Sequence, residues 1–231
     1  MQRYFAQNWH LCEPFLLSEE ESRHCISVMR NVIGNQLSVL DGVGNLILAK
    51  IIDPHPKRTS LQYLETIRTN PAKHNLHIAI SPTKSNDRIE WFLEKVCEIG
   101  VGKITPILFE RTERSKINLD RWNKIIVASC KQSSLLHFPI LAEPKRFQDF
   151  INEINSTQKL IVCAIGATSR LSKIDTTKEN ILIIGPEGDF TSEELNQIKS
   201  RNAEEISISE NILRVETAGI VGATLWNHFI E

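Results

Sequence analysis

The chain has little of what would tie it to a metal, a membrane or a disulfide framework. Its 231 residues include five cysteines, an odd number, and no two of them form a C-x-x-C pair. This argues against both a disulfide framework and a zinc site, so we expect no metal. No apolar run approaches the roughly 18 to 20 residues of a transmembrane helix. The first five residues do not begin a secretory signal, which favours a cytoplasmic protein without a membrane partner.

The common nucleotide-binding and hydrolase signatures are also missing. The chain contains no G-x-G-x-x-G, no Walker lysine, no G-x-S-x-G and no H-E-x-x-H. Dinucleotide-binding and P-loop interpretations therefore fit poorly. The G-x-G at residues 42–44 precedes no expected helix, and its composition is typical of a hairpin turn.

Charge is balanced overall but not along the chain. The 27 Lys and Arg residues nearly match the 28 Asp and Glu residues, for a net charge of −1. Residues 103–146, however, hold nine basic and four acidic residues, a net charge of +5. Residues 186–216 hold three basic and eight acidic residues, a net charge of −5. A neutral total can therefore hide a basic face.

The first 69 residues are patterned mostly as strands. Residues 36–40 and 46–52 are short apolar segments joined by a glycine-rich turn, and residues 61–68 alternate with period two. A capping box formed by Ser18 and Glu21 predicts one helix, which would run to about Met29. Several short strands in this length indicate a small barrel, followed by a linker at residues 69–73.

After residue 74 strands and helices alternate, which predicts an α/β fold around a parallel sheet. We expect strands at residues 76–80, 104–109, 160–165, 181–184 and 206–209, and helices at residues 86–99, 118–134, 147–154, 191–201 and 216–230. Ligands of such sheets bind at the carboxyl ends of the strands. Two of these ends carry unusual sequence, at residues 183–190 and 208–219.

The first of these strand ends contains G-P-E-G at residues 185–188 and runs into a capped helix at Thr191. Its glycines would let the backbone approach a ligand closely, and its proline stiffens the turn. The second contains I-L-R-x-E-T-A at residues 212–218 and enters the last helix. Either segment alone is compatible with an ordinary strand-to-helix turn.

Together the two segments resemble the ribosomal RNA small subunit methyltransferase E family, SPOUT enzymes that methylate N3 of a uridine in 16S rRNA. Residues 82–111 and the H-x-x-x-V-M-R at residues 24–30 are similar to further blocks of that family. The chain also departs from the pattern. Lys131 and Leu135 replace a usual acid and a usual arginine, Asp189 replaces a usual glycine, and residues 210–211 replace L-G.

The resemblance implies two domains. Residues 1–70 would form a PUA-like, RNA-binding β-barrel. Residues 74–231 would form a SPOUT α/β methyltransferase domain whose C-terminal stretch is threaded into a trefoil knot. The resemblance also implies ribosome biogenesis as the process, 16S rRNA of the small ribosomal subunit as the partner, and a homodimer. The small residues of the last helix, Gly219 and Gly222 among them, would let a second helix approach closely.

The same resemblance implies S-adenosyl-L-methionine as the cofactor and assigns residues to it. The expected cofactor-binding residues are Ala164, Ile184, Gly185, Pro186, Glu187, Gly188, Ile208, Ser209, Ile212, Leu213 and Ala218. The expected RNA-binding residues, which would contact phosphate, are Arg30, Lys84, Arg88, Arg111 and Arg114.

The expected catalytic residues are Arg214 and Glu216. Uridine N3 must lose its proton during attack, and the negative charge that develops on O2 and O4 is stabilised by a fixed cation, for which Arg214 is the candidate. Glu216 would either orient Arg214 or act as the base. Two other interpretations stay open: a SPOUT methyltransferase with another RNA target, and a non-catalytic RNA-binding or ribosome-assembly factor. The intact glycines and Arg214 favour the enzyme, because a pure binder needs no cofactor turn.

Overall fold

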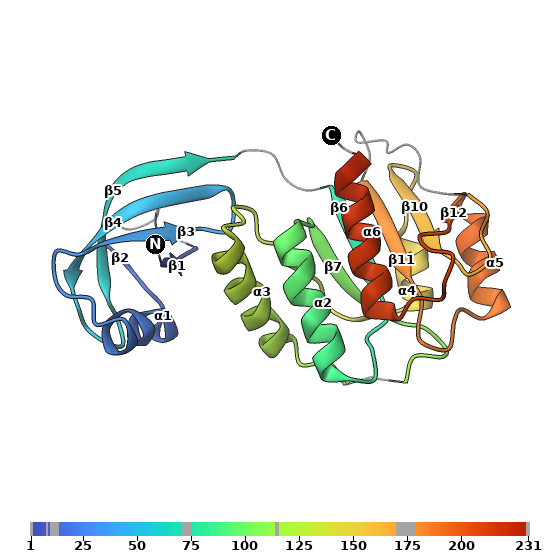
Figure 1. Cartoon of the computed structure of the whole chain (residues 1–231), viewed down its shortest axis with the longest axis horizontal. Helices are drawn as coiled ribbons and strands as arrows, with labels where there is room; N and C mark the ends of the chain where they lie inside the picture. Colours follow the sequence, from blue (N-terminus) through green and yellow to red (C-terminus); the bar gives the residue numbers. More distant parts are fainter. Residues whose placement is uncertain are drawn as a thin grey trace. The chain divides into compact units, whose positions relative to one another are not determined.

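The computed structural model describes residues 2–7, 9, 14–70, 75–113, 116–169 and 179–229. The chain divides into two compact units (Figure 1). The first consists of Met1–Lys73 and Val127–Phe138, and the second of His74–Ile126 and Pro139–Glu231. Of the linker predicted at residues 69–73, residues 71–73 lie outside the described residues, as does Arg114. Thr69 belongs to a strand. No helix in the described ranges combines the length and the apolar character needed to cross a membrane.

The first unit is built on a curled sheet whose strand order is β1-β3-β4-β5-β2 (Figure 1). These strands are β1 (Arg3–Phe5), β2 (Phe15–Leu16), β3 (Gln36–Leu40), β4 (Asn45–Asp53) and β5 (Ser60–Thr69). The predicted hairpin is confirmed, since β3 and β4 pair antiparallel around the turn at residues 41–44. Asp41 closes that turn by accepting hydrogen bonds from the backbone N–H groups of Val43 and Asn45, both at 2.9 Å.

One helical segment precedes this hairpin in the sequence. α1 (Glu19–Arg23) starts at Ser18, whose hydroxyl accepts the N–H of Glu21. Only this half of the predicted capping box forms, because the Glu21 carboxylate accepts the N–H of Phe5 and pairs with Lys131. The helix then widens into the π-helical turn η1 (His24–Val28). The predicted helix is confirmed in extent, although its second half has π-helical hydrogen bonding. Arg30 follows with a left-handed φ of 56°.

The first unit also includes a segment that the sequence pattern did not assign to it. Val127–Phe138 contains the second half of α3 (Leu119–Ser133). Phe138 donates its N–H to Gly42 O at 2.9 Å, and Gly44 donates to Leu136 O at 3.0 Å. These backbone bonds join residues that lie more than ninety positions apart, and hydrophobic periodicity carries no signal for such a pairing.

The second unit is built on a parallel sheet with strand order β12-β10-β11-β6-β7-β8, with β9 paired to β7. Its strands are β6 (Leu76–Ile80), β7 (Lys103–Leu108), β8 (Ile140–Leu141), β9 (Lys145–Arg146), β10 (Gln158–Cys163), β11 (Glu179–Ile184) and β12 (Glu204–Ile206). The mixed α/β fold is confirmed. β12 ends earlier than predicted, so residues 207–214 form an irregular segment that leads to the last helix.

Helices cover both faces of this sheet (Figure 1). α2 (Asn86–Ile99) and α6 (Val215–Phe229) pack together on one face, and α4 (Phe147–Glu153) and α5 (Ser192–Ser200) lie on the other. A Cβ at Gly219 would collide with Phe92 of α2, and one at Gly222 would collide with Leu182 of β11. Both glycines therefore let α6 pack against its own unit, which is a different use from the close approach of a second helix that we expected.

Candidate functional site

A cavity of about 310 Å³ lies at the carboxyl ends of β10, β11 and β12. All but one of the residues expected to bind a cofactor line it: Ala164, Ile184, Gly185, Pro186, Glu187, Ile208, Ser209, Ile212, Leu213 and Ala218. The exception is Gly188. The sequence pattern missed Cys163, Ile165, Gly166 and Ser207, which also line the cavity. These residues could have been found from their position, because they lie at or just after the ends of the two neighbouring strands β10 and β12.

The wall formed by residues 207–214 has no regular secondary structure, but side chains hold its backbone in place. The hydroxyl of Ser207 donates to Ser209 O at 2.9 Å, and the hydroxyl of Ser209 accepts the N–H of Asn211 at 3.0 Å. Ala164 donates its N–H to Ile206 O at 3.2 Å and so ties the end of β10 to the start of this wall. Ile212 remains 78% exposed, which leaves an apolar side chain at the rim of the cavity.

The opposite wall is the turn at residues 185–190. Asp189 donates its N–H to Pro186 O at 2.9 Å and adopts a left-handed φ of 61°, a conformation that Asp tolerates better than most residues. A Cβ at Gly185 would lie 2.8 Å from the ring of Phe190. The glycine is therefore required by internal packing of the turn, whereas the sequence suggested a close approach to a ligand.

Arg111 reaches this turn from the loop that follows β7. Its Nη1 donates to Gly188 O at 2.9 Å and lies 3.5 Å from Phe190 O. A Cβ at Gly188 would lie 3.3 Å from the Cβ of Arg111, so the arginine side chain lies directly over the glycine. We expected Arg111 to contact RNA phosphate, and in the structure its guanidinium is engaged within the chain.

Two arginines other than Arg111, Arg88 and Arg214, line the cavity and differ in their partners. Arg88 Nη1 lies 3.4 Å from Glu187 Oε1, and its Nε lies 3.8 Å from Glu216 Oε1. The side chain of Arg214 is exposed and makes no ion pair or hydrogen bond with the described part of the chain. Arg214 is therefore a cation at the cavity that is available for a ligand, whereas Arg88 is held by two carboxylates.

The surroundings of Glu216 fit neither of the two roles that the sequence suggested for it, orienting Arg214 or acting as the base. Its side chain is 6% exposed, and its ion-pair partner is Arg88. The other carboxylate oxygen, Oε2, is closed to solvent and has no hydrogen-bond partner among the described residues. Glu216 does not line the cavity. A carboxylate enclosed in this way is poorly placed to take a proton from a base in the cavity, since a general base must reach that proton.

The remaining predicted RNA contacts lie in both units. Arg30 is exposed and follows η1 in the first unit. Lys84 precedes α2 in the second unit and forms an exposed ion pair with Glu113 at 2.8 Å. This ion pair raises the pKa of Lys84 through a hydrogen bond to Glu113. Such exposed pairs are weak and leave the lysine able to exchange partners.

Cys163 is the ionisable cavity residue whose pKa is clearly shifted. Burial raises its pKa to about 12, so the thiol stays neutral and unreactive at physiological pH. No group of three or more His, Cys, Asp or Glu side chains in the described ranges is arranged to hold a metal ion. Among the described lining residues, the cavity thus combines apolar side chains, fixed backbone groups, the carboxylates of Glu187 and Asp189 and the unpaired cation Arg214.

Comparisons with known proteins match both units. Residues 70–227 match the model of an RNA methyltransferase domain, and residues 17–61 match that of an RNA methyltransferase PUA domain. A ribosomal RNA small subunit methyltransferase E from Rickettsia conorii is 28% identical over 213 residues, covering 89% of this chain and 85% of the relative. The protein of the same name from Buchnera aphidicola is also 28% identical and covers 96% of this chain and 90% of its own.

One solved structure that is similar to this chain contains a bound cofactor. It is a Legionella pneumophila protein, classed as a methyltransferase, in complex with the bound cofactor SAM. Its sequence is 26% identical to this chain, the alignment covers 99% of this chain and 97% of the other, and the TM-score is 0.83.

Proposed function

The chain belongs to the RNA methyltransferase family, and on that premise we propose that it methylates N3 of a uridine in 16S rRNA of the small ribosomal subunit. The observation that carries this proposal is the cavity at the ends of β10, β11 and β12, with the free cation Arg214 on its wall. Relatives that match most of the chain's length are named as methyltransferases of small subunit ribosomal RNA.

The cofactor of the proposed reaction is S-adenosyl-L-methionine, and the cavity suits it. The volume of about 310 Å³ lies at the lower end of the range for small-molecule sites. Ile184, Leu213 and Ala218 offer apolar surface to an adenosine, and Glu187 and Asp189 offer negative charge to the cationic methionyl part. Residues 164, 184–187 and 208–213 would hold the cofactor, which supplies a methyl group on a sulfonium.

The proposed role of Arg214 is to stabilise the negative charge that develops on the uridine during methyl transfer. Methylation at uridine N3 requires that the Watson–Crick edge be unpaired and that the N3 proton leave. Negative charge then develops on O2 and O4 of the base. An exposed guanidinium on the cavity wall can donate to one of these oxygens at that stage, and a preorganised donor of this kind lowers a barrier by about 2.7 to 4 kcal/mol.

Arg30 and Lys84 carry the proposed contacts to rRNA phosphate. Both are exposed. The first unit would act as the PUA-type RNA-binding domain, as its family match suggests. Neutralising one phosphate releases counterions, so each such contact adds about one unit to the dependence of affinity on salt.

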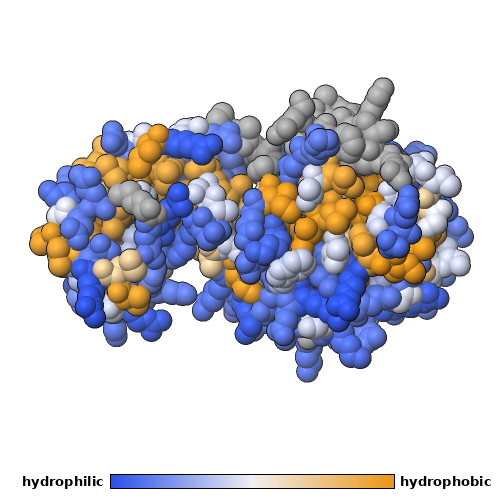
Figure 2. Space-filling model, viewed as in Figure 1, coloured by the Kyte–Doolittle hydropathy of each residue, from blue (hydrophilic) through white to orange (hydrophobic). Residues whose placement is uncertain are grey.

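The proposed fold is the SPOUT arrangement with a C-terminal trefoil knot, in a cytoplasmic homodimer. Support for a partner comes from the surface of α6, over which apolar side chains gather in Figure 2. Trp91 of α2 is 46% exposed, which is unusual for a tryptophan outside an interface. Light scattering at micromolar concentration tests the dimer, and a monomeric mass would contradict it.

The function is tested on rRNA from a strain that lacks this protein. We expect mass mapping of modified nucleosides to show the loss of one N3-methyluridine from the small subunit rRNA. Purified protein with S-adenosylmethionine should restore it on isolated small subunits, and protein carrying Arg214→Ala should not. An unchanged set of modified uridines in the deletion strain would overturn the proposal.

A further inference from the structure

We infer that Arg111 is a positioning residue of the cofactor cavity, acting on the turn at residues 185–190. This inference rests on the proposed function and reassigns a residue that the sequence pattern gave to RNA. The guanidinium contacts the carbonyl oxygens on both sides of Asp189, those of Gly188 and Phe190. Asp189 itself lines the cavity.

Asp189 gives the turn a left-handed residue, which two hydrogen bonds within the turn help to fix: its N–H to Pro186 O and the N–H of Phe190 to its Oδ1. Left-handed non-glycine residues cost on the order of 1 kcal/mol or more and persist where their surroundings fix them, and Arg111 adds such a support from outside the turn. A single guanidinium that contacts the carbonyls before and after this residue restricts rotation on both sides of it. Its stem also lies over Gly188, where a Cβ would approach Arg111 Cβ to 3.3 Å, so the turn has little room to move toward that side.

Arg111 is itself held by the loop at residues 109–113. The hydroxyl of Thr112 accepts the N–H of Phe109 at 2.9 Å and contacts the hydroxyl of Ser81, just after β6, at the same distance. One hydrogen bond within the loop and bonds to two other segments thus fix it. The second of these segments is α5, because Glu110 donates its N–H to Glu194 Oε1 at 2.8 Å.

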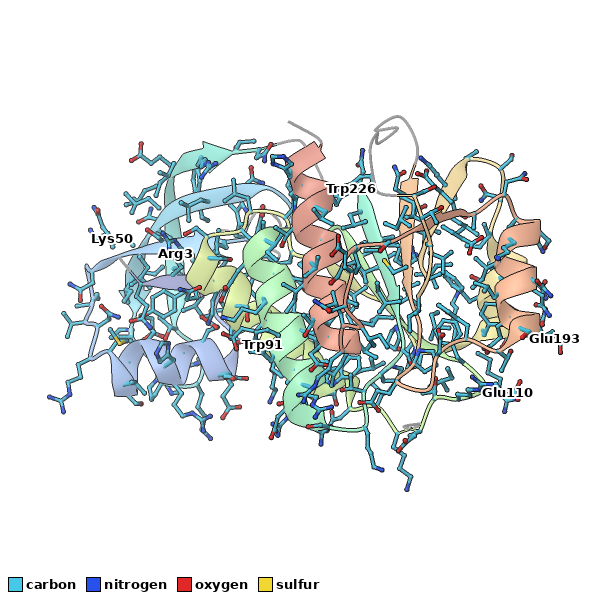
Figure 3. The ribbon with its side chains drawn as sticks, turned by 45° about the vertical axis from the view of Figure 1, so that its right-hand side comes forward. Arg3, Lys50, Trp91, Glu110, Glu193 and Trp226 are labelled. Carbon is cyan, nitrogen blue, oxygen red and sulfur yellow. The ribbon has the colours of Figure 1, made fainter. Side chains whose placement is uncertain are left out.

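Glu194 links the loop to the helix that follows the turn. Its side chain also accepts the N–H of Thr191 and completes the capping box of α5. Figure 3 shows Glu110 on the side of the unit where α5 carries Glu193. The turn and the helix that follows it are therefore tied to the same loop: Arg111 contacts the carbonyl oxygens of Gly188 and Phe190, and Glu194 joins α5 to Glu110. This preorganised support suits a residue that shapes a binding wall.

If Arg111 contacted RNA phosphate, its removal would affect RNA and cofactor binding in the opposite way from the removal of a positioning residue. Removing a phosphate contact weakens RNA binding at all sequences, lowers the salt slope by about one unit and leaves cofactor affinity alone. Removing a support of the cavity wall weakens cofactor binding, because the free protein must then order the turn when the cofactor binds. The two roles can be separated by measuring both affinities on the same variants.

The experiment uses the full chain with Arg111→Ala, Arg111→Met and Arg111→Lys. Arg111→Met keeps the apolar stem over Gly188, and Arg111→Lys keeps a cationic donor. The matched control is Arg146→Ala, an exposed arginine at the start of α4 with no bond to the turn. Calorimetry gives the affinity for S-adenosylhomocysteine, filter binding at several salt concentrations gives the affinity for small subunit rRNA, and thermal melting checks the fold.

We expect Arg111→Met to lose about tenfold or more in cofactor affinity, the usual effect of one hydrogen bond from a charged group. Arg111→Lys should lose less than Arg111→Met, and Arg146→Ala should bind like the wild type. The RNA salt slope of Arg111→Met should match that of Arg146→Ala. A loss of cofactor affinity below about threefold in Arg111→Met overturns the inference. Wild-type protein that binds no cofactor would instead refute the proposed function.

Discussion

Arg88 and Glu216 form an ion pair in which the two side chains differ sharply in burial. The nearest atoms, Arg88 Nε and Glu216 Oε1, are 3.8 Å apart. The carboxylate side is 6% exposed and the guanidinium side 40%. Since the second oxygen of Glu216 has no partner among the described residues, Arg88 carries most of the compensation for a buried negative charge.

This ion pair predicts that replacing Arg88 alone destabilises the protein more than replacing both residues. Arg88→Met should lower the free energy of unfolding by about 1 to 3 kcal/mol, because it strands the Glu216 carboxylate. Adding Glu216→Gln should restore most of that loss, since a neutral amide needs no counter-charge. Urea denaturation of the single and double variants measures both steps. A double variant less stable than Arg88→Met would contradict this account.

Arg214 should matter to the rate of methyl transfer and little to binding. Arg214→Ala is expected to cut the single-turnover rate on isolated small subunits by about 10² to 10³. Cofactor affinity should barely change, because the interaction belongs to the transition state. Lysine should restore little, since it lacks the planar fork of arginine. A near-normal single-turnover rate for Arg214→Ala would refute the role.

Gly185 should tolerate a side chain less well than Gly188 does. Gly185→Ala places a methyl group 2.8 Å from the Phe190 ring, whereas Gly188→Ala places one 3.3 Å from Arg111 Cβ, a less severe contact. Overpacking of this kind costs about 1 to 3 kcal/mol. We expect Gly185→Ala to weaken cofactor binding more, and Phe190→Leu in the same chain to recover part of the loss. Calorimetric titration checks the order, and equal affinities would contradict it.

His77 should make the second unit sensitive to acid. Burial lowers its pKa from 6.5 to about 3, with a further lowering by the charges of Lys103 and Lys145. The unfolded chain therefore binds a proton between these pH values that the folded chain does not, so stability falls as pH drops from about 6.5 toward 3. The slope from one such group reaches about 1.4 kcal/mol per pH unit.

The matched variants for this effect are His77→Gln and His55→Gln. His77 Nε2 lies 2.7 Å from the hydroxyl of Thr105, and glutamine preserves a polar partner there without titrating. His55 is exposed, so its replacement is the control. Denaturation at pH 7 through 4 should show a shallower loss of stability for His77→Gln alone. Parallel curves for the wild type and His77→Gln would count against the assignment.

Lys131 pairs with Glu21 in the first unit, where both side chains are largely buried. Lys131→Glu, the charge usual in the related family, would place two carboxylates together and should destabilise the protein by about 2 to 4 kcal/mol. The exchanged pair, Glu21→Lys with Lys131→Glu, should regain most of it. Thermal melting of the three proteins tests the coupling. An exchanged pair that melts no higher than Lys131→Glu would show that the ion pair does not account for the loss of stability.

Local patterns predicted the elements of the fold well. The capping box at Thr191 and the glycine stop at Gly100 are both present, with Gly100 at a φ of 97°. α2 spans the predicted residues 86–99, with Ser85 at its N-cap position. α3 and α5 begin one residue later than predicted, because period and capping identify an element but not its exact first residue.

The position of the candidate site could be predicted from the sequence, but the structural roles of several of its residues could not. The carboxyl ends of parallel strands gave the place of the cavity. Gly185 packs against Phe190, and Arg111 lies over Gly188. The spacing of these residues in the sequence predicts neither contact. Glu216 was expected beside Arg214, and its actual partner Arg88 comes from a helix more than a hundred residues earlier in the chain.

The composition of the first unit has a consequence for synthesis on the ribosome. Val127–Phe138 belongs to this unit, although more than fifty residues of the second unit precede it in the chain. An emerging N-terminal segment therefore lacks the partner of Glu21 and the strand-like contacts of Gly42 and Gly44 until residue 138 has left the exit tunnel. More than a third of the α/β unit must therefore be synthesised before the N-terminal unit can close. A nascent chain stalled at residue 73 should remain open to protease, whereas one stalled well beyond residue 138 should protect its first 70 residues.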